Sequence, residues 1–243
     1  METLPRKPDL LLVGTANRHK ISEISSVLAD LMVPGGGRIS VAGSDALPPA
    51  PPVEETGATF RENAEIKARA YGLQTLALPP ERRPRWVLAD DSGLCVDALG
   101  GAPGVLSARY AGGSATDADN NLKLLAALSG IPPRDRGAEF VCVMACVEID
   151  PEPGDKQEAA ADAARLLFFA EGRCRGQILE GTRGTGGFGY DPLFLVPSLG
   201  KTFAELTQAE KNERSHRGLA LQVFHRRIKE CLQTRSGRSG EPW

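Results

Sequence analysis

Short apolar runs alternate with segments of helical periodicity along most of this chain. The run Asp9–Gly14 (DLLLVG) has the continuous apolar character and the final glycine of a buried strand. In the next segment, Lys20–Leu31, apolar side chains recur at the spacing of one helix face. A strand, a polar turn and a helix, repeated further along the chain, predict an α/β fold with a mainly parallel or mixed sheet.

The same patterns extend this alternation to the C-terminal helix. Capping boxes at Thr59–Glu62 and Thr207–Glu210 predict two helix starts, and the first helix should run to about Gln74. Further helices are expected over Ala118–Leu128 and after Ser215, which is placed to cap the last one. Strands are expected at four apolar runs: Trp86–Ala89, Leu94–Val96, Glu139–Ile149 and Arg165–Glu171. Residues 150–164 are expected to form a surface excursion and residues 235–243 a loose tail.

Length and charge restrict the function. A chain of 243 residues suits one large domain or two closely packed lobes. The net charge is −2, so no overall basic surface indicates nucleic-acid binding, and a bound anion would need a local pocket. No apolar run approaches the roughly 20 residues that span a bilayer. Met1–Asp9 lacks the apolar centre of a signal peptide, so we expect a cytoplasmic protein that does not bind membranes.

Several well-known site types are excluded by missing motifs. The five cysteines form no Cys-x-x-Cys pair and are odd in number, which indicates reduced, mostly buried thiols. The three histidines do not cluster with them, which argues against a zinc site. The chain also lacks the P-loop pattern, the G-x-S-x-G elbow of α/β hydrolases and a G-x-G-x-x-G motif after the first strand.

The turn between the first strand and the first helix is rich in hydrogen-bond donors. Such a turn presents free backbone N–H groups and the positive end of the helix dipole, an arrangement that binds anions. Thr15 and Asn17 add side-chain donors, and Lys20 adds a cation. The alternative is a capped helix with a solvated lysine.

Two acidic pairs are candidates for metal binding. Asp90 and Asp91 follow an apolar run at the predicted C-terminal end of a strand, where α/β proteins often hold hydrated Mg²⁺. Because side chains alternate along a strand, only one of the two is expected to face a ligand. A turn that uses Asp and Gly for its geometry is the alternative. Glu54 and Glu55 lie on a loop and could add a metal ligand, or could be an exposed pair.

Two later segments are candidates for contact with the organic part of a ligand. The segment Gly184–Pro192 has four glycines around two aromatic residues, which would let the backbone approach a flat ligand while a ring stacks on it. Asp191 could accept hydrogen bonds there; a tight hairpin or bulge is the alternative. His216 and Arg217 lie at the start of the last helix, with Lys211 shortly before. Because the helix dipole disfavours cations at this end, an anion or carbonyl oxygen nearby or a solvated charge cluster would explain them.

Taken in order, these segments resemble a known protein family, although no single motif does so by itself. The chain resembles the inosine triphosphate pyrophosphatase family in four collinear stretches: TANRHK (15–20), EETGATFRENAEIKARA (54–70), LADDSGLCVDALGGAPGVLSARYAG (88–112) and GTGGFGYDPLFLVPSLGKTFAELTQAEKNERSHRG (184–218). The resemblance implies a single domain over residues 1–243, with an elongated mixed β-sheet flanked by helices and two lobes around a nucleotide-binding groove. It also implies a homodimer and a Mg²⁺-dependent enzyme. The family converts ITP, dITP and XTP to the monophosphate and pyrophosphate, which removes deaminated purines from the nucleotide pool.

The resemblance also implies roles for matched positions. Asp91 is the expected general base and, with Glu54, a metal ligand, while Glu55 remains an alternative to Glu54. The triphosphate is expected to contact Thr15, Ala16, Asn17, Arg18, His19 and Lys20, with support from Asn63 and Lys67. The rest of the nucleotide is expected to contact Ser92, Phe188, Gly189, Tyr190, Asp191, Lys211, His216 and Arg217. Two departures from the family pattern, Ala16 where glycine is frequent and the excursion at 150–164, bear on specificity and dimer contacts more than on activity.

Elementary chemistry is consistent with these roles. A nucleoside triphosphate brings up to about four negative charges, which Mg²⁺ and basic side chains must offset. Asp91 could orient or deprotonate the water that attacks the α-phosphorus. His216 and Arg217 could donate to a purine 6-oxo group, which adenine lacks. Three alternatives stay open: a pyrophosphatase for UTP, dTTP or modified pyrimidines, a sensor that binds ITP without cleaving it, and a nucleic-acid-binding module supported only by the basic stretch 225–238.

Overall fold

The protein folds around one mixed seven-stranded sheet. The structure is a computed structural model, and it describes residues 10–15, 18–29, 38–150 and 163–236. The strand order is β2-β1-β3-β4-β5-β6-β7. The first three strands pair in parallel and are β1 (Leu10–Val13), β2 (Ser40–Gly43) and β3 (Trp86–Val96). The remaining neighbours are antiparallel and are β4 (Gly137–Ile149), β5 (Ala164–Ile178), β6 (Phe194–Val196) and β7 (Lys201–Thr202).

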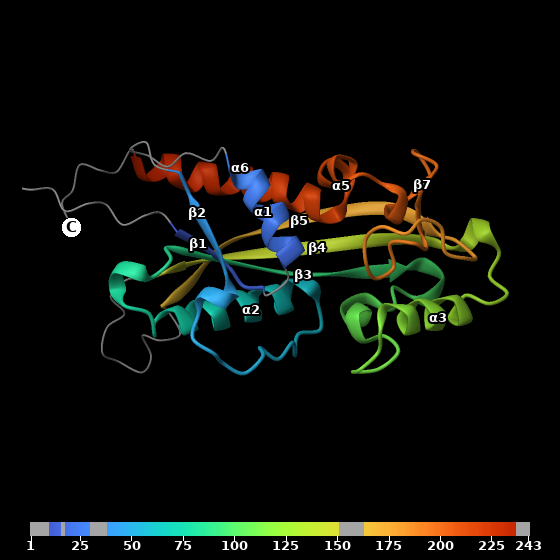
Figure 1. The fold of residues 1–243 in the computed structure, drawn as a ribbon, viewed down its shortest axis with the longest axis horizontal. Coiled ribbons are helices and arrows are strands. Elements are labelled where there is room, and N and C mark those ends of the chain that lie inside the picture. Colours follow the sequence, from blue (N-terminus) through green and yellow to red (C-terminus); the bar gives the residue numbers. More distant parts are fainter. Residues whose placement is uncertain (1–9, 16–17, 30–37, 151–162, 237–243) are drawn as a thin grey trace, which may run out of the picture.

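Helices cover both faces of this sheet, and the long strands β3, β4 and β5 give the molecule its elongated shape (Figure 1). One face carries α1 (Arg18–Leu28) and α6 (His216–Ser236), with the short α5 (Gln208–Arg214) before α6. The other face carries α2 (Phe60–Thr75) and α3 (Asp117–Ala127). Short 3-10 turns connect them at Ser44–Ala46, Pro80–Arg82, Asp97–Leu99, Gly104–Arg109, Pro133–Asp135 and Phe203–Glu205. The predicted α/β class with an elongated mixed sheet is confirmed.

Apolar side chains are buried on both faces of the sheet. In β1, Leu11 packs into the core beneath α1 and α6, whereas its neighbour Leu12 packs into the core beneath α2. This explains the continuous apolar run, since a strand covered on both faces needs no polar side. A third cluster, which includes Leu124 of α3 and Phe194 of β6, fills the other end of the molecule.

Local sequence signals located several helix starts. Thr59 and Thr207 each accept a hydrogen bond from the backbone N–H three residues later, so both predicted capping boxes are confirmed. Ser215 Oγ accepts a hydrogen bond from Gly218 N at 3.1 Å and caps α6 as expected. The helix predicted over residues 118–128 is α3, one residue earlier.

The prediction that a strand ends at Asp90–Gly93 is wrong. β3 is a single strand of 11 residues, because every residue in it pairs with β4, from Trp86 opposite Glu148 to Val96 opposite Ala138. On its other side, β1 ends at Val13, opposite Leu88. Within the described ranges, β3 therefore has no neighbouring strand on that side from Asp90 to Gly93. We call this open stretch of the β3 edge the notch.

Three other boundaries differ from the sequence prediction. α1 begins and ends earlier than the helix predicted over residues 20–31. β5 continues past Glu171 to Ile178, because its polar residues alternate with buried ones and keep pairing with β4. α6 extends to Ser236, into the expected tail. Residues 151–162 of the predicted excursion, residues 237–243 of the tail and Met1–Asp9 lie outside the described residues.

The cysteine prediction is confirmed, since all five cysteines are free and Cys142, Cys146 and Cys174 are buried. Across the part of the chain that the structure describes, no helix is long and apolar enough to span a bilayer.

Candidate active site

Asp90 and Asp91 lie in the notch and point to opposite faces of β3. Lys20 Nζ of α1 donates to both carboxylate oxygens of Asp90, at 3.0 and 2.8 Å. Asp91 instead faces α2, where Asn63 Nδ2 donates to its Oδ2 at 3.1 Å. The alternation expected of a strand is thus confirmed, and it divides the pair between two environments.

The Asp90 carboxylate is buried and paired. Burial alone would raise the pKa of Asp90, but the positive charges of Lys20 and Arg217 hold it well below its ordinary value. Asp90 therefore stays ionised at neutral pH. This state suits a residue that anchors Lys20 of α1 against β3.

Fewer positive charges offset the burial of Asp91 than that of Asp90. Lys67 Nζ lies 3.4 Å from Asp91 Oδ1, and Asn63 and Lys67 reach the carboxylate together because they are four residues apart on one face of α2. The Asn63 amide is itself fixed, since its Oδ1 accepts a hydrogen bond from Gly57 N at 2.7 Å. Burial raises the pKa of Asp91 above its ordinary value, despite the opposing effects of Lys67 and Asn63. A carboxylate of raised basicity in a notch is a candidate general base.

Glu55, not Glu54, contacts this cluster. Lys67 Nζ lies 2.8 Å from Glu55 Oε1, and Arg109 lies 3.7 Å from the other oxygen of the same carboxylate. Burial would lower the pKa of Lys67, but Asp91 and Glu55 raise it above its ordinary value, so the ammonium group stays charged. Glu54 is exposed on the same loop.

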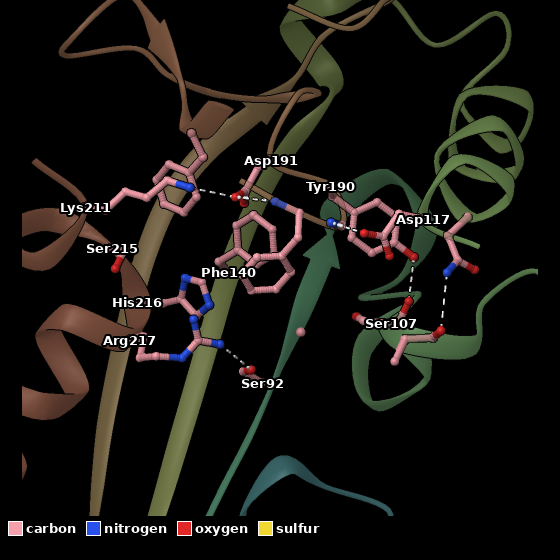
Figure 2. Close-up of a pocket in the computed structure, with 16 residues that line it drawn as sticks. Ser92, Ser107, Asp117, Phe140, Tyr190, Asp191, Lys211, Ser215, His216 and Arg217 are labelled. Atoms are coloured by element: carbon pink, nitrogen blue, oxygen red, sulfur yellow. Dashed lines mark hydrogen bonds and ion pairs between the residues drawn. The ribbon is translucent and has the colours of Figure 1, made fainter. Parts of the chain in front are cut away.

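A pocket with an aromatic wall lies beyond the notch (Figure 2). The His216 ring at the start of α6 stacks on Phe140 of β4, with ring centres 4.7 Å apart and planes 11° apart. Phe140 in turn stacks on Phe203 at 5.4 Å. Neither phenylalanine stands out in the sequence, because a buried aromatic residue is usually an ordinary core residue.

His216 is buried and neutral. Burial lowers its pKa well below the ordinary 6.5, and the neighbouring charge of Arg217 lowers it further. Within the described residues, His216 Nδ1 has no hydrogen-bond partner. Buried polar atoms are nearly always paired in native proteins, so this nitrogen marks a position for a bound molecule.

Ser92 and Phe188 complete the pocket around Arg217. Arg217 Nη2 lies 3.5 Å from Ser92 Oγ, and both side chains point into the same space in Figure 2. The Arg217 guanidinium carbon lies 5.8 Å from the centre of the Phe188 ring, which is 49% exposed. A half-exposed aromatic ring and a guanidinium group facing each other suit a flat ligand between or beside them.

The glycine-rich segment before β6 is a series of turns held by side chains, not a hairpin. Asp191 Oδ2 accepts hydrogen bonds from Lys211 Nζ at 2.8 Å and from Phe188 N at 3.2 Å. Burial raises the pKa of Asp191, against the effect of Lys211. Tyr190 is buried, and its hydroxyl donates to Ser107 O at 2.8 Å, so its ring is a fixed part of the wall. Asp191 is thus already engaged within the protein.

The residues expected to bind the triphosphate are only partly described. Thr15 follows β1, and its carbonyl oxygen accepts a hydrogen bond from Ser44 N at 3.3 Å. Lys20 reaches the notch through Asp90. Ala16 and Asn17 lie outside the described residues, and Arg18 and His19 are described only as the backbone start of α1.

The structure therefore brings two sets of predicted site residues together at the notch, one around Asp91 and one around His216. Asp90 and Ser92 connect the two sets, because they flank Asp91 on β3 and their side chains both face α6. Sequence reasoning missed Phe140, Phe203 and Asp117, which also line the pocket. The capping pattern Thr116–Asp119 would have placed Asp117 at the start of α3.

Comparison with known proteins agrees with this architecture. The model of the Ham1 family matches residues 11–227. The chain is 47% identical over 211 residues to a dITP/XTP pyrophosphatase of Gloeobacter violaceus, covering 87% of this chain and 90% of that one. It is 44% identical over 214 residues to a dITP/XTP pyrophosphatase of Yersinia pseudotuberculosis, covering 88% and 95%.

Solved structures agree as well. A HAM1 protein from Coxiella burnetii has a TM-score of 0.73 and 39% identity, covering 91% of this chain and 98% of that one. The Staphylococcus aureus Ham1 protein has a TM-score of 0.71 and 36% identity, with the same coverage. The resemblance inferred from the four motif stretches is confirmed, and the chain belongs to the Ham1 family.

Proposed function

We propose that the protein is a Mg²⁺-dependent nucleoside triphosphate pyrophosphatase that converts ITP, dITP and XTP to the monophosphate and pyrophosphate. This activity would remove deaminated purines from the nucleotide pool. The names of the relatives support the proposal, since they are dITP/XTP pyrophosphatases that align over most of both chains. The observation that carries it is the placement of Asp91, a buried carboxylate of raised pKa, beside a pocket that contains the unpartnered Nδ1 of His216.

The proposed reaction needs one proton acceptor. A water oxygen forms a bond to the α-phosphorus, the bond from that phosphorus to the α–β bridging oxygen breaks, and pyrophosphate leaves. Asp91 takes the proton from the water. Because burial raises its pKa, Asp91 is a stronger base than an exposed aspartate. Lys67 and Lys20 lie close enough to the notch to offset phosphate charge.

The donor set fits Mg²⁺ delivered with the nucleotide. Mg²⁺ usually binds one or two protein carboxylates together with substrate phosphates and water. In the described ranges, no three His, Cys, Asp or Glu side chains gather into a protein-only metal site. Asp91 and Glu55, which share Lys67, provide two carboxylates in one cluster, and Glu54 is one residue away. We propose that Asp91 and a glutamate of this loop hold Mg²⁺, which when bound neutralises the negative charge of the triphosphate.

The pocket around His216 supports selection of 6-oxo purines. In its neutral form, His216 can carry its proton on Nδ1 and donate it to a base oxygen. Arg217 lies beside it as a second donor. An adenine presents its own 6-amino donor there and would leave both groups unpaired, which is the kind of mismatch that a polar site rejects strongly.

Pyrophosphate release from a panel of triphosphates tests the proposal directly. ITP, XTP, GTP, ATP, dTTP and UTP should each be incubated with Mg²⁺ or with EDTA, and the monophosphate identified by chromatography. We expect rapid, Mg²⁺-dependent cleavage of ITP and XTP, with ATP and GTP nearly untouched. Preference for UTP or dTTP would replace the proposal with a pyrimidine pyrophosphatase. Binding of ITP without any cleavage would replace it with a nucleotide sensor.

The proposal includes a homodimer, which the family resemblance implies. Light scattering during size-exclusion chromatography should then give about twice the chain mass of 25.9 kDa. The mass of a single chain would contradict this part and leave the proposed reaction in place.

A further inference from the structure

One helix holds both polar backbone groups of Gly189, next to Phe188. Gly189 N donates to Asp117 Oδ2 at 2.7 Å, and Asn121 Nδ2 donates to Gly189 O at 3.0 Å. Asp117 and Asn121 are four residues apart in the first turns of α3, so they project from the same face of the helix. Neither residue belongs to the chemistry assigned above. The residue that both contact, Gly189, contributes its backbone to the pocket wall.

The backbone on the other side of Phe188 is also fixed. Phe188 N donates to Asp191 Oδ2 at 3.2 Å. Gly187 and Gly189 have φ angles of +75° and +58°, a conformation that glycine adopts without strain. Phe188 thus has a glycine in a left-handed conformation on each side, and side chains from two elements hold the adjoining N–H groups. This backbone sets the direction in which the Phe188 side chain leaves the chain.

The Phe188 ring has little structural reason to be held so firmly. It is 49% exposed, and the guanidinium carbon of Arg217 lies 5.8 Å from its centre. An exposed ring contributes little to the core, so fixing its backbone serves contact with something that enters the pocket. Figure 2 shows Asp117 and Arg217 on opposite sides of that pocket, so α3 acts on the wall that faces α6.

We infer that Asp117 and Asn121 are positioning residues of the base site: they hold Gly189 so that Phe188 faces Arg217 before a nucleotide arrives. A preformed wall avoids the entropy cost of ordering the loop during binding. The inference rests on the proposed function for the identity of the ligand, a purine nucleotide. Its consequence is specific, because loss of either hydrogen bond weakens nucleotide binding and leaves the chemistry at Asp91 unchanged.

Steady-state kinetics of Asp117 variants with ITP test this inference. We expect Asp117→Ala to raise KM about five- to tenfold, which corresponds to the binding free energy of one aromatic contact, while kcat stays within about twofold of the wild-type value. Asp117→Asn should restore KM, because its amide oxygen still accepts from Gly189 N. Asn121→Ala should act in the same direction as Asp117→Ala.

Asp119→Ala is the matched control. Asp119 lies in the same turn of α3 but bonds Thr116 at the helix start and does not contact Gly189. This variant should lower the melting temperature and leave KM unchanged. Equal increases in KM for Asp117→Ala and Asp119→Ala would overturn the inference, as would a loss confined to kcat or a failure of Asp117→Asn to restore KM.

Calorimetric titration with ITP in EDTA separates this inference from the proposed function. If the wild-type protein binds ITP and cleaves no triphosphate, the proposed function fails, and weaker ITP binding by Asp117→Ala than by Asp119→Ala still supports the positioning role. If the wild-type protein cleaves ITP and the two variants bind it equally, the positioning role fails alone. A wild-type protein that neither binds nor cleaves ITP would overturn both.

Discussion

Lys67 Nζ lies 3.4 Å from Asp91 Oδ1 and joins α2 to the notch in β3. The same ammonium group lies 2.8 Å from Glu55, so two carboxylates share one positive charge. Burial raises the pKa of Asp91, and the Lys67 charge is the strongest opposing influence. The basicity of Asp91 on β3 therefore depends on a balance that a single substitution on α2 can shift.

Replacing Lys67 by methionine should move the acid limb of the pH–rate profile to higher pH. Asp91 must be ionised to accept a proton, so kcat/KM falls as the pH drops through its pKa. Without Lys67, that pKa rises further, because burial is less opposed. The measurement is kcat/KM for ITP across the acid and neutral range. Lys67→Arg, which keeps the charge, should have a limb close to wild type, and an unshifted limb in Lys67→Met would contradict the prediction.

Asp91→Asn should reduce kcat by a factor of about 10²–10⁴, the usual worth of a general base. Nucleotide binding should persist, because the amide keeps the size of the carboxylate. The control is Asp97→Asn, which makes the same chemical change just beyond the end of β3 in an exposed ion pair with Arg175. Near-wild-type turnover of Asp91→Asn would remove Asp91 from the proposed role.

Features governed by local chemistry could be predicted from the sequence. The capping boxes at Thr59 and Thr207 fix helix starts through bonds within four residues, so the pattern alone contains the cause. The opposite directions of Asp90 and Asp91 follow from strand geometry in the same way. The motif order identified the family, although no single motif did.

Features that depend on distant pairing could not be predicted. Asp90–Gly93 has the composition of a turn, yet it stays extended because β4 pairs with it throughout, some 50 residues later. Glu54 and Glu55 are indistinguishable in sequence, and only the position of Lys67 on α2 selects Glu55 for contact. The stacking of His216 on Phe140 joins α6 to β4, which no spacing along the chain reveals.

The buried pair of Lys20 and Asp90 should contribute strongly to stability. Lys20→Met leaves the Asp90 charge buried without its main partner and should lower the free energy of unfolding by about 2–4 kcal/mol. The double variant Lys20→Met/Asp90→Asn should recover part of this loss, as measured by urea unfolding. Because the folded-state pKa of Asp90 is lowered, its stabilisation is present above the unfolded-state pKa and is lost as the pH falls through the folded-state value. Additive losses in the double variant would contradict the coupling.

His216→Phe should remove base selection while it keeps the stack on Phe140. We expect kcat/KM for ITP to fall about 10–100-fold and that for ATP to change little, so the preference between them shrinks. The wild-type preference should be constant from mildly acidic to neutral pH, since burial holds the pKa of His216 well below 6.5. A preference that changes with a midpoint near 6.5 would mean that His216 titrates in this range.

Gly187→Ala should disrupt the pocket, whereas Gly200→Ala should only strain the backbone. Both glycines have positive φ, +75° and +62°, so each substitution carries a similar left-handed penalty of about 1 kcal/mol. At Gly200 an added Cβ meets no atom within 4 Å. At Gly187 it would overlap Asp191 Oδ2 and approach Lys211 Nζ, which separates that buried ion pair.

Gly187→Ala should therefore lose more stability than Gly200→Ala, and it alone should raise KM for ITP, because Asp191 also holds the Phe188 backbone. Urea unfolding and steady-state kinetics of the two variants, measured side by side, check both parts. Equal stability losses with unchanged KM would show that separating the Asp191–Lys211 pair costs little stability and that the pocket wall does not depend on Asp191.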